Sequence, residues 1–199
     1  MFCRLATTAA PTPKLAFVSD QDRVRWDRRY AERRSVPVAE AALPVPFQPF
    51  ADIFPTAGYA IDLACGRGEA AVWLARRGID VCGYDVSPVA IGQARALAQQ
   101  CGVATNCRFE VLDLDNGLPA GDPADVVICN RFRDAALDSA IVERLAAGGL
   151  LAVSALSEVD GFSGPFRAKA GELRQVFGGL EQIAGAEANG EAWLLARRR

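Results

Sequence analysis

The stretch IDLACGRG at residues 61–68 places a carboxylate inside a short apolar run, directly before two glycines one residue apart. Glycines crowded at the end of a strand let the backbone approach the polar groups of a ligand closely. Turns of this kind bind nucleoside triphosphates, nicotinamide dinucleotides or S-adenosylmethionine (SAM). A triphosphate-binding P-loop requires GxxxxGK followed by Ser or Thr, and no lysine lies near this turn, so the first class is excluded.

Electrostatics separates the two remaining ligands. Gly66, Gly68 and Ala71 satisfy the GxGxxA dinucleotide pattern, and Asp85 follows about 20 residues later, where a ribose hydroxyl is bound. A diphosphate on this turn would face the carboxylate of Asp62, at a cost of about 3–4 kcal/mol across 4–6 Å. SAM carries an ammonium and a sulfonium, so the same carboxylate attracts it. Asp62 favours SAM; an NAD(P)-binding oxidoreductase stays open, as does an Asp that only caps the turn.

The elements that must position these residues alternate between strand-length apolar runs and helix-period segments from residue 59 onward. The predicted strands are 60–63, 81–84, 107–112, 126–129 and 150–156, with a final pair at 180–188 and 191–196. That final pair flanks Asn189-Gly190, a strong hairpin signal. The pattern predicts an α/β fold: a Rossmann-like, doubly wound, mostly parallel seven-stranded sheet with a C-terminal antiparallel hairpin.

A chain of 199 residues is expected to form a single domain. Residues 1–18 are rich in Ala, Thr and Pro and are predicted to be a flexible lead-in, followed by a single domain over 19–199. Within it, 19–58 form a helical cap whose first helix begins at the capping-box pattern of Ser19 and Asp22, and 59–199 form the Rossmann-like core. The closing run Arg197–Arg199 is expected to be a solvated tail.

Composition excludes several other functions. The net charge is −2 and no long basic run occurs, so binding driven by nucleic-acid phosphates is not expected. No apolar stretch reaches membrane-spanning length, so no membrane association is expected. The chain has no histidine, and its six cysteines form no CxxC pair, so we expect no metal site. Scattered cysteines in apolar runs favour a reduced, cytoplasmic setting.

Four segments, DLACGRG, YDVS, VLDLD and LAAGGLL, resemble the successive motifs of class I SAM-dependent methyltransferases over roughly residues 59–156. RWDRRY before the core and GPFRAKAGELRQVF after the fifth strand are similar to the tellurite-resistance and thiopurine methyltransferase-like branch. The resemblance implies SAM as cofactor and methyl transfer to a small-molecule acceptor. The residues that it places around the cofactor are Asp62, Ala64, Cys65, Gly66, Gly68, Asp85, Val86, Asp113, Leu114 and Cys129.

The resemblance also implies roles for some of these residues. Asp62 would orient the methionine ammonium, Asp85 would accept both ribose hydroxyls, and Asp113 would accept from the adenine amino group. The family turn often has glycine where Ala64 stands, a difference that we expect to be mild because alanine adds only one methyl group.

On the acceptor side, the resemblance implies that the residues ending the fourth strand lie beside the transferable methyl, which makes Asn130 and Arg131 the candidate catalytic residues. The predicted acceptor-binding residues are Trp26, Tyr30, Arg131, Phe132 and Arg133. The run from Arg131 to Arg133 is unfamiliar at this place in the family, so a non-catalytic SAM-binding protein stays open. Histidine, the usual base near neutral pH, is absent, which favours an acceptor that arrives ionised, such as a thiolate or another chalcogen anion.

Overall fold

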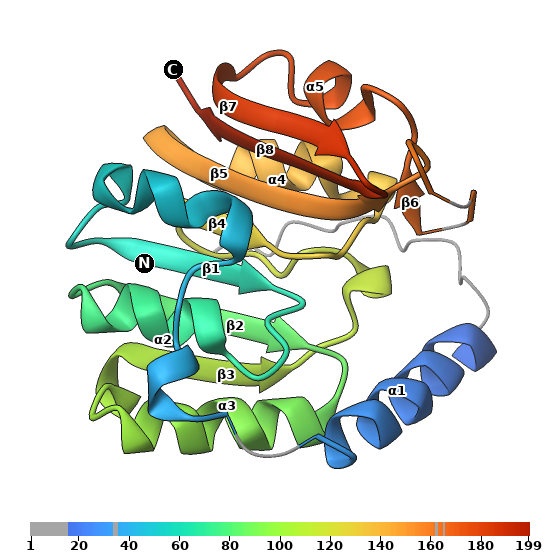
Figure 1. The fold of residues 1–199 in the computed structure, drawn as a ribbon. Helices are drawn as coiled ribbons and strands as arrows, with labels where there is room; N and C mark the ends of the chain where they lie inside the picture. The colour runs from blue at the N-terminus through green and yellow to red at the C-terminus, as the bar shows by residue number, and fades with distance from the viewer. Residues whose placement is uncertain (1–15, 34–35, 162, 165) are drawn as a thin grey trace, which may run out of the picture.

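A single mixed sheet forms the centre of the molecule in the computed structural model, which describes residues 16–33, 36–161, 163–164 and 166–199 (Figure 1). Its principal strands are β1 (Tyr59–Leu63), β2 (Asp80–Asp85), β3 (Cys107–Val111), β4 (Ala124–Cys129), β5 (Leu145–Ser157), β7 (Glu181–Ala188) and β8 (Glu191–Arg197). They lie in the order β3-β2-β1-β4-β5-β8-β7, and the two-residue β6 (Arg167–Ala168) pairs with β5. The first five strands are parallel, and β8 is antiparallel to both β5 and β7. The predicted fold class is confirmed.

The terminal hairpin forms where the sequence predicts it. Asn189 and Gly190 have φ values of 53° and 74°, so both turn residues adopt the left-handed conformation that a two-residue hairpin with right-handed strand twist requires. The strand before the hairpin, β5, is longer than predicted, because it begins at Leu145 rather than at Leu150.

Helices cover both faces of the sheet. On one face lie α2 (Glu69–Arg76), α3 (Pro88–Gln100) and the 3₁₀ segment η2 (Val45–Ile53); on the other lie α4 (Asp138–Arg144) and α5 (Glu172–Val176) (Figure 1). Each face has its own apolar core, one containing Phe47 and Leu74 and the other containing Ile141 and Phe177. Burial on both faces explains why the central strands are nearly continuous apolar runs.

The N-terminal helix α1 (Ala16–Ala31) lies at the carboxyl ends of the parallel strands, beside α3 (Figure 1). It starts before Ser19, so Ser19 lies inside the helix and the predicted helix start is wrong. Residues 1–15 of the predicted lead-in lie outside the described residues, whereas residues 16–18 already belong to α1. Among the described residues, no helix has the length and apolar content needed to cross a membrane.

Two of the three C-terminal arginines, Arg197 and Arg198, bind the fold, which corrects the expectation of a solvated tail for them, whereas Arg199 is exposed. Arg197 is the last residue of β8, and its guanidinium donates to the carbonyl of Gly148 at 3.1 Å. The guanidinium of Arg198 donates to the carbonyl oxygens of Val142, Glu143 and Leu145 at the end of α4. These carbonyls have no partner within their helix, so a cation that binds them stabilises the helix end.

Candidate functional site

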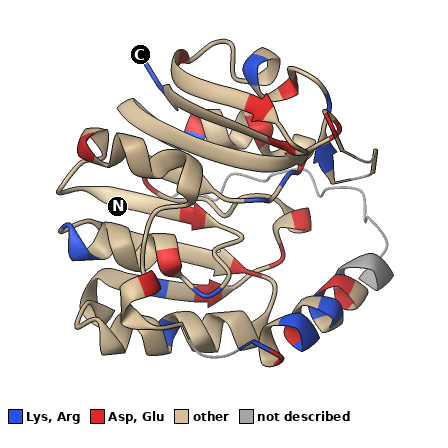
Figure 2. Ribbon diagram, in the orientation of Figure 1, with Lys and Arg blue, Asp and Glu red and all other residues tan. Residues whose placement is uncertain are grey.

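The sheet order changes direction between β1 and β4. From β1 the chain runs outward through β2 to β3 and then returns to β4 on the other side of β1. Asp62 on β1 lies opposite Gly83 of β2 and Ile128 of β4. Ligands of open α/β sheets bind in the crevice outside the carboxyl ends of the strands at such a switch point. Figure 2 shows acidic residues at the ends of β1 and β2, whereas acidic and basic residues are mixed along α1.

Asp62 is a buried carboxylate with an unsatisfied oxygen. The residue is 2% exposed, and its Oδ2 atom has no hydrogen-bond partner within the part of the chain that the structure describes. Burial raises the pKa of Asp62 well above its ordinary value, and the negative charges of Glu69 and Asp85 add to this rise, while a bond from the Ala71 backbone opposes it. A buried charge without a partner is costly, so the position fits a group that accepts a cationic ligand.

The glycine turn after β1 brings the backbone close to α1. Ala64, Gly66 and Gly68 all have left-handed φ values, at 52°, 54° and 79° respectively. A Cβ atom on Gly66 would lie 2.9 Å from the Tyr30 hydroxyl, so a larger residue would not fit there. Ala64 is strained in this conformation, a cost that the sequence alone does not reveal.

Asp85, at the end of β2, is held in a fixed orientation by the backbone. Its Oδ2 accepts from the Gly66 amide at 2.9 Å, and its Oδ1 accepts from the Ser87 amide at 2.9 Å. Burial raises the pKa of Asp85, and the two backbone hydrogen bonds offset part of that rise. Each carboxylate oxygen keeps a further acceptor direction, which is the capacity needed to bind two adjacent hydroxyl groups.

The predicted adenine-side residues surround the ends of β2 and β3. Asp113 is half-buried and caps the 3₁₀ turn η4 (Leu114–Asn116) by accepting from the Asp115 amide at 3.0 Å. Leu114 is buried and Val86 is half-buried. The structure therefore gathers these residues at the same edge as Asp62 and Asp85.

Helix α1 is attached to this edge through Asp27 and Tyr30. The carboxylate of Asp27 accepts from the Ser87 hydroxyl at 2.5 Å, and Gln93 on α3 donates to the Tyr30 carbonyl at 3.1 Å. Burial raises the pKa of the Tyr30 hydroxyl, and the nearby Asp85 charge raises it further. Trp26 stacks on Tyr30 with ring centroids 5.8 Å apart. Both predicted aromatic residues thus lie on α1, and the Tyr30 hydroxyl lies beside Gly66 of the glycine turn.

The end of β4 carries Cys129, Asn130 and Arg131. Cys129 is 2% exposed, and its Sγ donates to the Phe132 carbonyl at 3.5 Å; burial, followed by the charge of Asp62, raises its pKa. Asn130 is exposed, and Arg131 has a left-handed φ of 56° and forms an ion pair with Glu191 at the surface. Phe132 is half-buried against the core on the α4 face.

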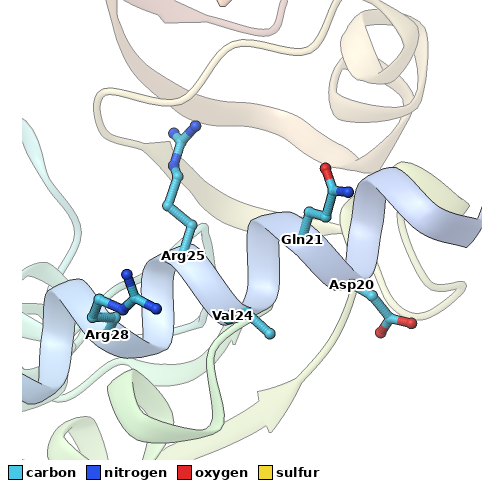
Figure 3. Close-up of a pocket in the computed structure, with 5 residues that line it drawn as sticks. All are labelled: Asp20, Gln21, Val24, Arg25 and Arg28. Carbon is cyan, nitrogen blue, oxygen red and sulfur yellow. The ribbon is translucent and has the colours of Figure 1, made fainter.

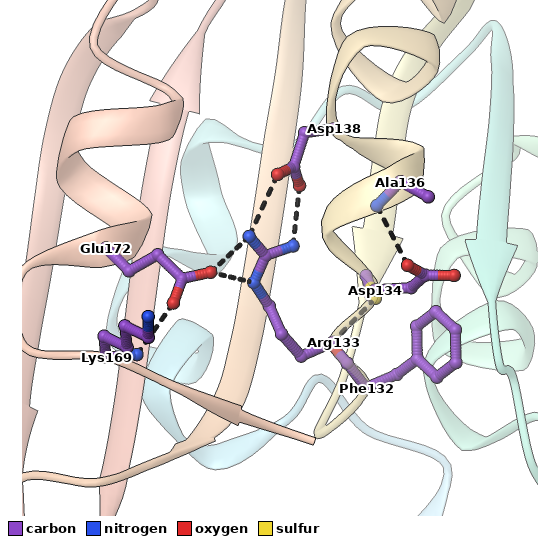
Figure 4. A network of polar contacts seen from close by, with 8 residues as sticks. Phe132, Arg133, Asp134, Ala136, Asp138, Lys169 and Glu172 are labelled. Carbon is purple, nitrogen blue, oxygen red and sulfur yellow. Dashed lines mark hydrogen bonds and ion pairs between the residues drawn. The ribbon is translucent and has the colours of Figure 1, made fainter. Parts of the chain in front are cut away.

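Arg133 occupies a different place from the predicted acceptor site. Its side chain is 7% exposed and forms two bonds to the Asp138 carboxylate, at 2.7 and 2.9 Å, as well as bonds to Glu172 at 2.5 and 2.8 Å (Figure 4). Glu172 also accepts from the Lys169 amide at 2.8 Å. Because the guanidinium binds two carboxylates, it joins the loop after β4 to α5. The structure therefore does not support the prediction that Arg133 binds the acceptor.

Sequence reasoning did not identify three residues that organise the site: Asp27, Ser154 and Glu172. Two of them lie in segments that it did single out, because Asp27 belongs to RWDRRY and Glu172 to GPFRAKAGELRQVF. Each is a carboxylate that ties a peripheral segment to the core, Asp27 through Ser87 and Glu172 through Arg133. Ser154 had no signal in the sequence, since a serine in an apolar strand resembles any small core residue.

A surface hollow of about 430 Å³ lies along α1, lined within the described residues by Asp20, Gln21, Val24, Arg25 and Arg28 (Figure 3). At 100° per residue these side chains occupy the side of α1 turned away from Tyr30. The hollow is therefore separate from the edge that carries Asp62 and Asp85.

Comparisons with known proteins agree with this arrangement. Residues 60–149 match the family model described as a methyltransferase domain. No curated protein matches the chain significantly in sequence. Among solved structures, TehB from Haemophilus influenzae is similar with a TM-score of 0.70 and 17% identity, over 87% of this chain and 67% of that one.

Two further solved structures cover nearly the whole chain. Magnesium protoporphyrin IX methyltransferase from Synechocystis PCC 6803, with bound SAH, has a TM-score of 0.65 and 21% identity over 92% of this chain and 99% of its own. Geranyl diphosphate C-methyltransferase from Streptomyces coelicolor A3(2) has a TM-score of 0.68 and 14% identity over 94% and 100%. At these identities the three likenesses establish the fold.

Proposed function

We propose that this chain is a class I SAM-dependent methyltransferase and that it transfers the methyl group of SAM to a small-molecule acceptor. The observation that carries the proposal is the unsatisfied, fully buried oxygen of Asp62 beside the glycine turn. A cationic amino-acid group supplies the partner that this oxygen lacks, and Asp85, at the end of the neighbouring strand, is oriented for the ribose.

A dinucleotide fits this site less well. Its diphosphate would lie on the turn and on the first turn of α2, where backbone amides attract anions. That place already holds the carboxylate of Glu69, which pairs with Arg67 at 2.7 Å, and the carboxylate of Asp62 lies behind it. Because the Arg67 guanidinium offsets the charge of Glu69, Asp62 is the negative group that would repel a diphosphate there and attract the ammonium of SAM.

The proposed roles of the residues follow from these contacts. SAM supplies an electrophilic methyl group, and transfer is an in-line displacement that requires mainly alignment of the two reactants and exclusion of water. Asp62 and Asp85 hold the two ends of the cofactor, the turn from Ala64 to Gly68 permits close approach, and Tyr30 covers the turn. Asn130 and Arg131 lie where an acceptor would approach.

An acceptor that arrives ionised suits this chemistry, because the chain has no histidine and two other side chains near the strand ends keep their protons. Burial raises the pKa values of both Cys129 and Tyr30, so each keeps its proton at neutral pH. A thiolate or an oxyanion of selenium or tellurium needs no base. The likeness to TehB supports the tellurite-resistance and thiopurine methyltransferase-like branch, and Asp27 and Glu172 lie in the two segments on which the resemblance to that branch rests.

The test is calorimetric binding of S-adenosylhomocysteine (SAH) and of NADH to the purified protein. We expect SAH to bind and NADH not to bind, and Asp85→Asn to weaken SAH binding about 100-fold or more, because the negative charge is lost and a donating amide nitrogen replaces one of the two acceptor oxygens. Asp80→Asn is the matched control, since Asp80 lies at the opposite, exposed end of the same strand. Unchanged SAH affinity in Asp85→Asn, or binding of NADH instead of SAH, would refute the cofactor assignment.

Catalysis is tested separately by mass spectrometry of methylated products from a thiol, selenite and tellurite in the presence of SAM. Methylation of any of them supports the proposal. SAH binding without any methylated product would favour the alternative, a non-catalytic SAM-binding protein.

A further inference from the structure

Ser154 is a buried hydroxyl with two hydrogen-bond partners in the loop after β4. It is 4% exposed and lies on β5 between the apolar residues Val153 and Ala155. Its Oγ accepts from the Arg131 amide at 3.0 Å and donates to Oδ1 of Asn130 at 2.7 Å. A buried hydroxyl costs free energy unless it is hydrogen-bonded, so these two bonds are what allow a serine at this interior position.

The two bonds together determine how the Asn130 amide is turned. Because the Arg131 amide can only donate, it occupies a lone pair of the serine oxygen, and the serine hydrogen then needs an acceptor. The carbonyl oxygen of the Asn130 side chain supplies it. In the opposite orientation the Asn130 nitrogen would also donate to Ser154, and the buried hydroxyl hydrogen would lose this acceptor.

The position of Asn130 gives this orientation a consequence for the proposed reaction. Leu63 of β1 lies opposite Cys129 of β4, and Cys129 lies opposite Val153 of β5. Asn130 therefore follows at the strand tips, between the start of the glycine turn at Ala64 and Ser154. Its side chain is exposed, and within the described part of the chain no group accepts from its amide nitrogen.

We propose that Ser154 is a positioning residue, which turns Asn130 so that the site offers the methyl acceptor a neutral hydrogen-bond donor. This inference rests on the proposed methyltransferase function. A neutral donor beside a sulfonium adds no charge repulsion, and it binds an oxygen lone pair or an anion of the acceptor without supplying or removing a proton. The acceptor class that fits is one that carries an oxygen next to its nucleophilic atom, as selenite and tellurite do.

The first test needs no turnover. In protein labelled with ¹⁵N-asparagine and saturated with SAH, we expect the Asn130 side-chain amide to be rigid, with an order parameter of about 0.8, and to fall below about 0.6 in Ser154→Ala. The exposed amide of Asn116 serves as the internal reference for a mobile side chain. Equal rigidity of Asn130 in wild type and Ser154→Ala would overturn the inference. Failure to bind SAH, in contrast, would count against the proposed function itself.

The second test is a double-mutant cycle on kcat/KM for methyl transfer from SAM to selenite. We expect Ser154→Ala to lower kcat/KM about 3–10-fold in the wild-type background and to have no further effect in Asn130→Ala, with the Kd for SAH within about twofold throughout. Asn130→Asp keeps the shape and the bond from Ser154 but offers no donor, so it should lose as much activity as Asn130→Ala. Additive losses, or an active Asn130→Asp, would overturn the inference. If no acceptor is methylated, the order parameters decide.

Discussion

The two halves of the proposed site treat buried charge in opposite ways. At the ends of β1 and β2, Asp62 and Asp85 are 2% and 5% exposed, and the bonds found for them in the described residues come from backbone amides. At the end of β4 and the start of α5, the buried guanidinium of Arg133 is bound by Asp138 and Glu172. Within the residues that the structure describes, no cation is bound to the carboxylates of the first half, whereas the charges of the second half are paired.

This difference distinguishes buried charged groups that bind a ligand from buried charged groups that stabilise the fold. A charge that is buried and unmatched lowers stability, so its presence indicates a group that arrives from outside. A charge that is buried and fully bound needs no ligand, and its partners show what it holds together. By this criterion we propose the half near Asp62 as the cofactor site, whereas Arg133 joins α5 to the loop after β4.

The largest effect expected from this comparison is on stability. Arg133→Met should lower the free energy of unfolding by about 2–4 kcal/mol, because two partly buried carboxylates lose their cation. The Kd for SAH should stay within about twofold of wild type, since the change lies outside the cofactor half. Urea denaturation followed by circular dichroism, together with calorimetry, measures the two quantities.

Arg131→Met is the matched control for that variant. Arg131 has a 63% exposed side chain and pairs with Glu191 at the surface, so its loss should change stability by no more than about 0.5 kcal/mol. Equal destabilisation by the two variants would show that the buried ion pairs of Arg133 stabilise the fold no more than the surface ion pair of Arg131 does. A large loss of SAH affinity in Arg133→Met would remove the distinction between the two halves.

The next largest expected effect is on SAH binding and concerns Asp62. Asp62→Asn should weaken SAH binding about 10–100-fold, because a charged hydrogen bond to the ammonium is lost, while the ligand-free protein becomes more stable. Calorimetry and thermal unfolding of the free protein measure the two changes. A variant that is both less stable and unchanged in affinity would contradict the role of Asp62.

The pH dependence of folding stability provides a further test of the role of Asp62. Burial raises the pKa of Asp62 in the folded protein, so as pH rises above the ordinary aspartate value of about 3.9 the unfolded chain loses its proton first. Stability from this group therefore falls between that value and the raised folded pKa. Asp62→Asn lacks this loss, so its stability advantage over wild type should grow across that interval. A constant difference would show that Asp62 keeps an ordinary pKa.

The sequence predicts the fold well because the relevant signals are local. Strand-length apolar runs, the glycine turn and Asn189-Gly190 each depend on a few neighbouring residues, and the structure has each of them near its predicted place, although β5 begins earlier, at Leu145. The acidic residues at the strand ends follow from the same reasoning, since the carboxyl ends of parallel strands meet at one edge.

The predictions that differ from the structure depend on distant partners. Arg133 reads as an exposed arginine in a loop, and only the fold brings Glu172, 39 residues later, into contact with it. Arg198 reads as a tail residue, and only the antiparallel course of β8 places it at the end of α4. Ser154 on β5 forms its hydrogen bond with Asn130, which follows the neighbouring strand β4. Residue type and spacing along one element carry no information about these pairs.

The smallest expected effect tests the backbone of the cofactor half. Ala64 has a φ of 52°, a conformation that costs a residue with a Cβ atom about 1–2 kcal/mol. Ala64→Gly removes this strain but makes the unfolded chain more flexible, so the net gain in unfolding free energy should be about 0.5–1 kcal/mol. Chemical denaturation measures it, and Ala70→Gly, in the first turn of α2, is the control that should lose stability. A loss in Ala64→Gly as well would show that the left-handed turn forms only with a ligand bound, and the two halves would then differ in order as well as in charge.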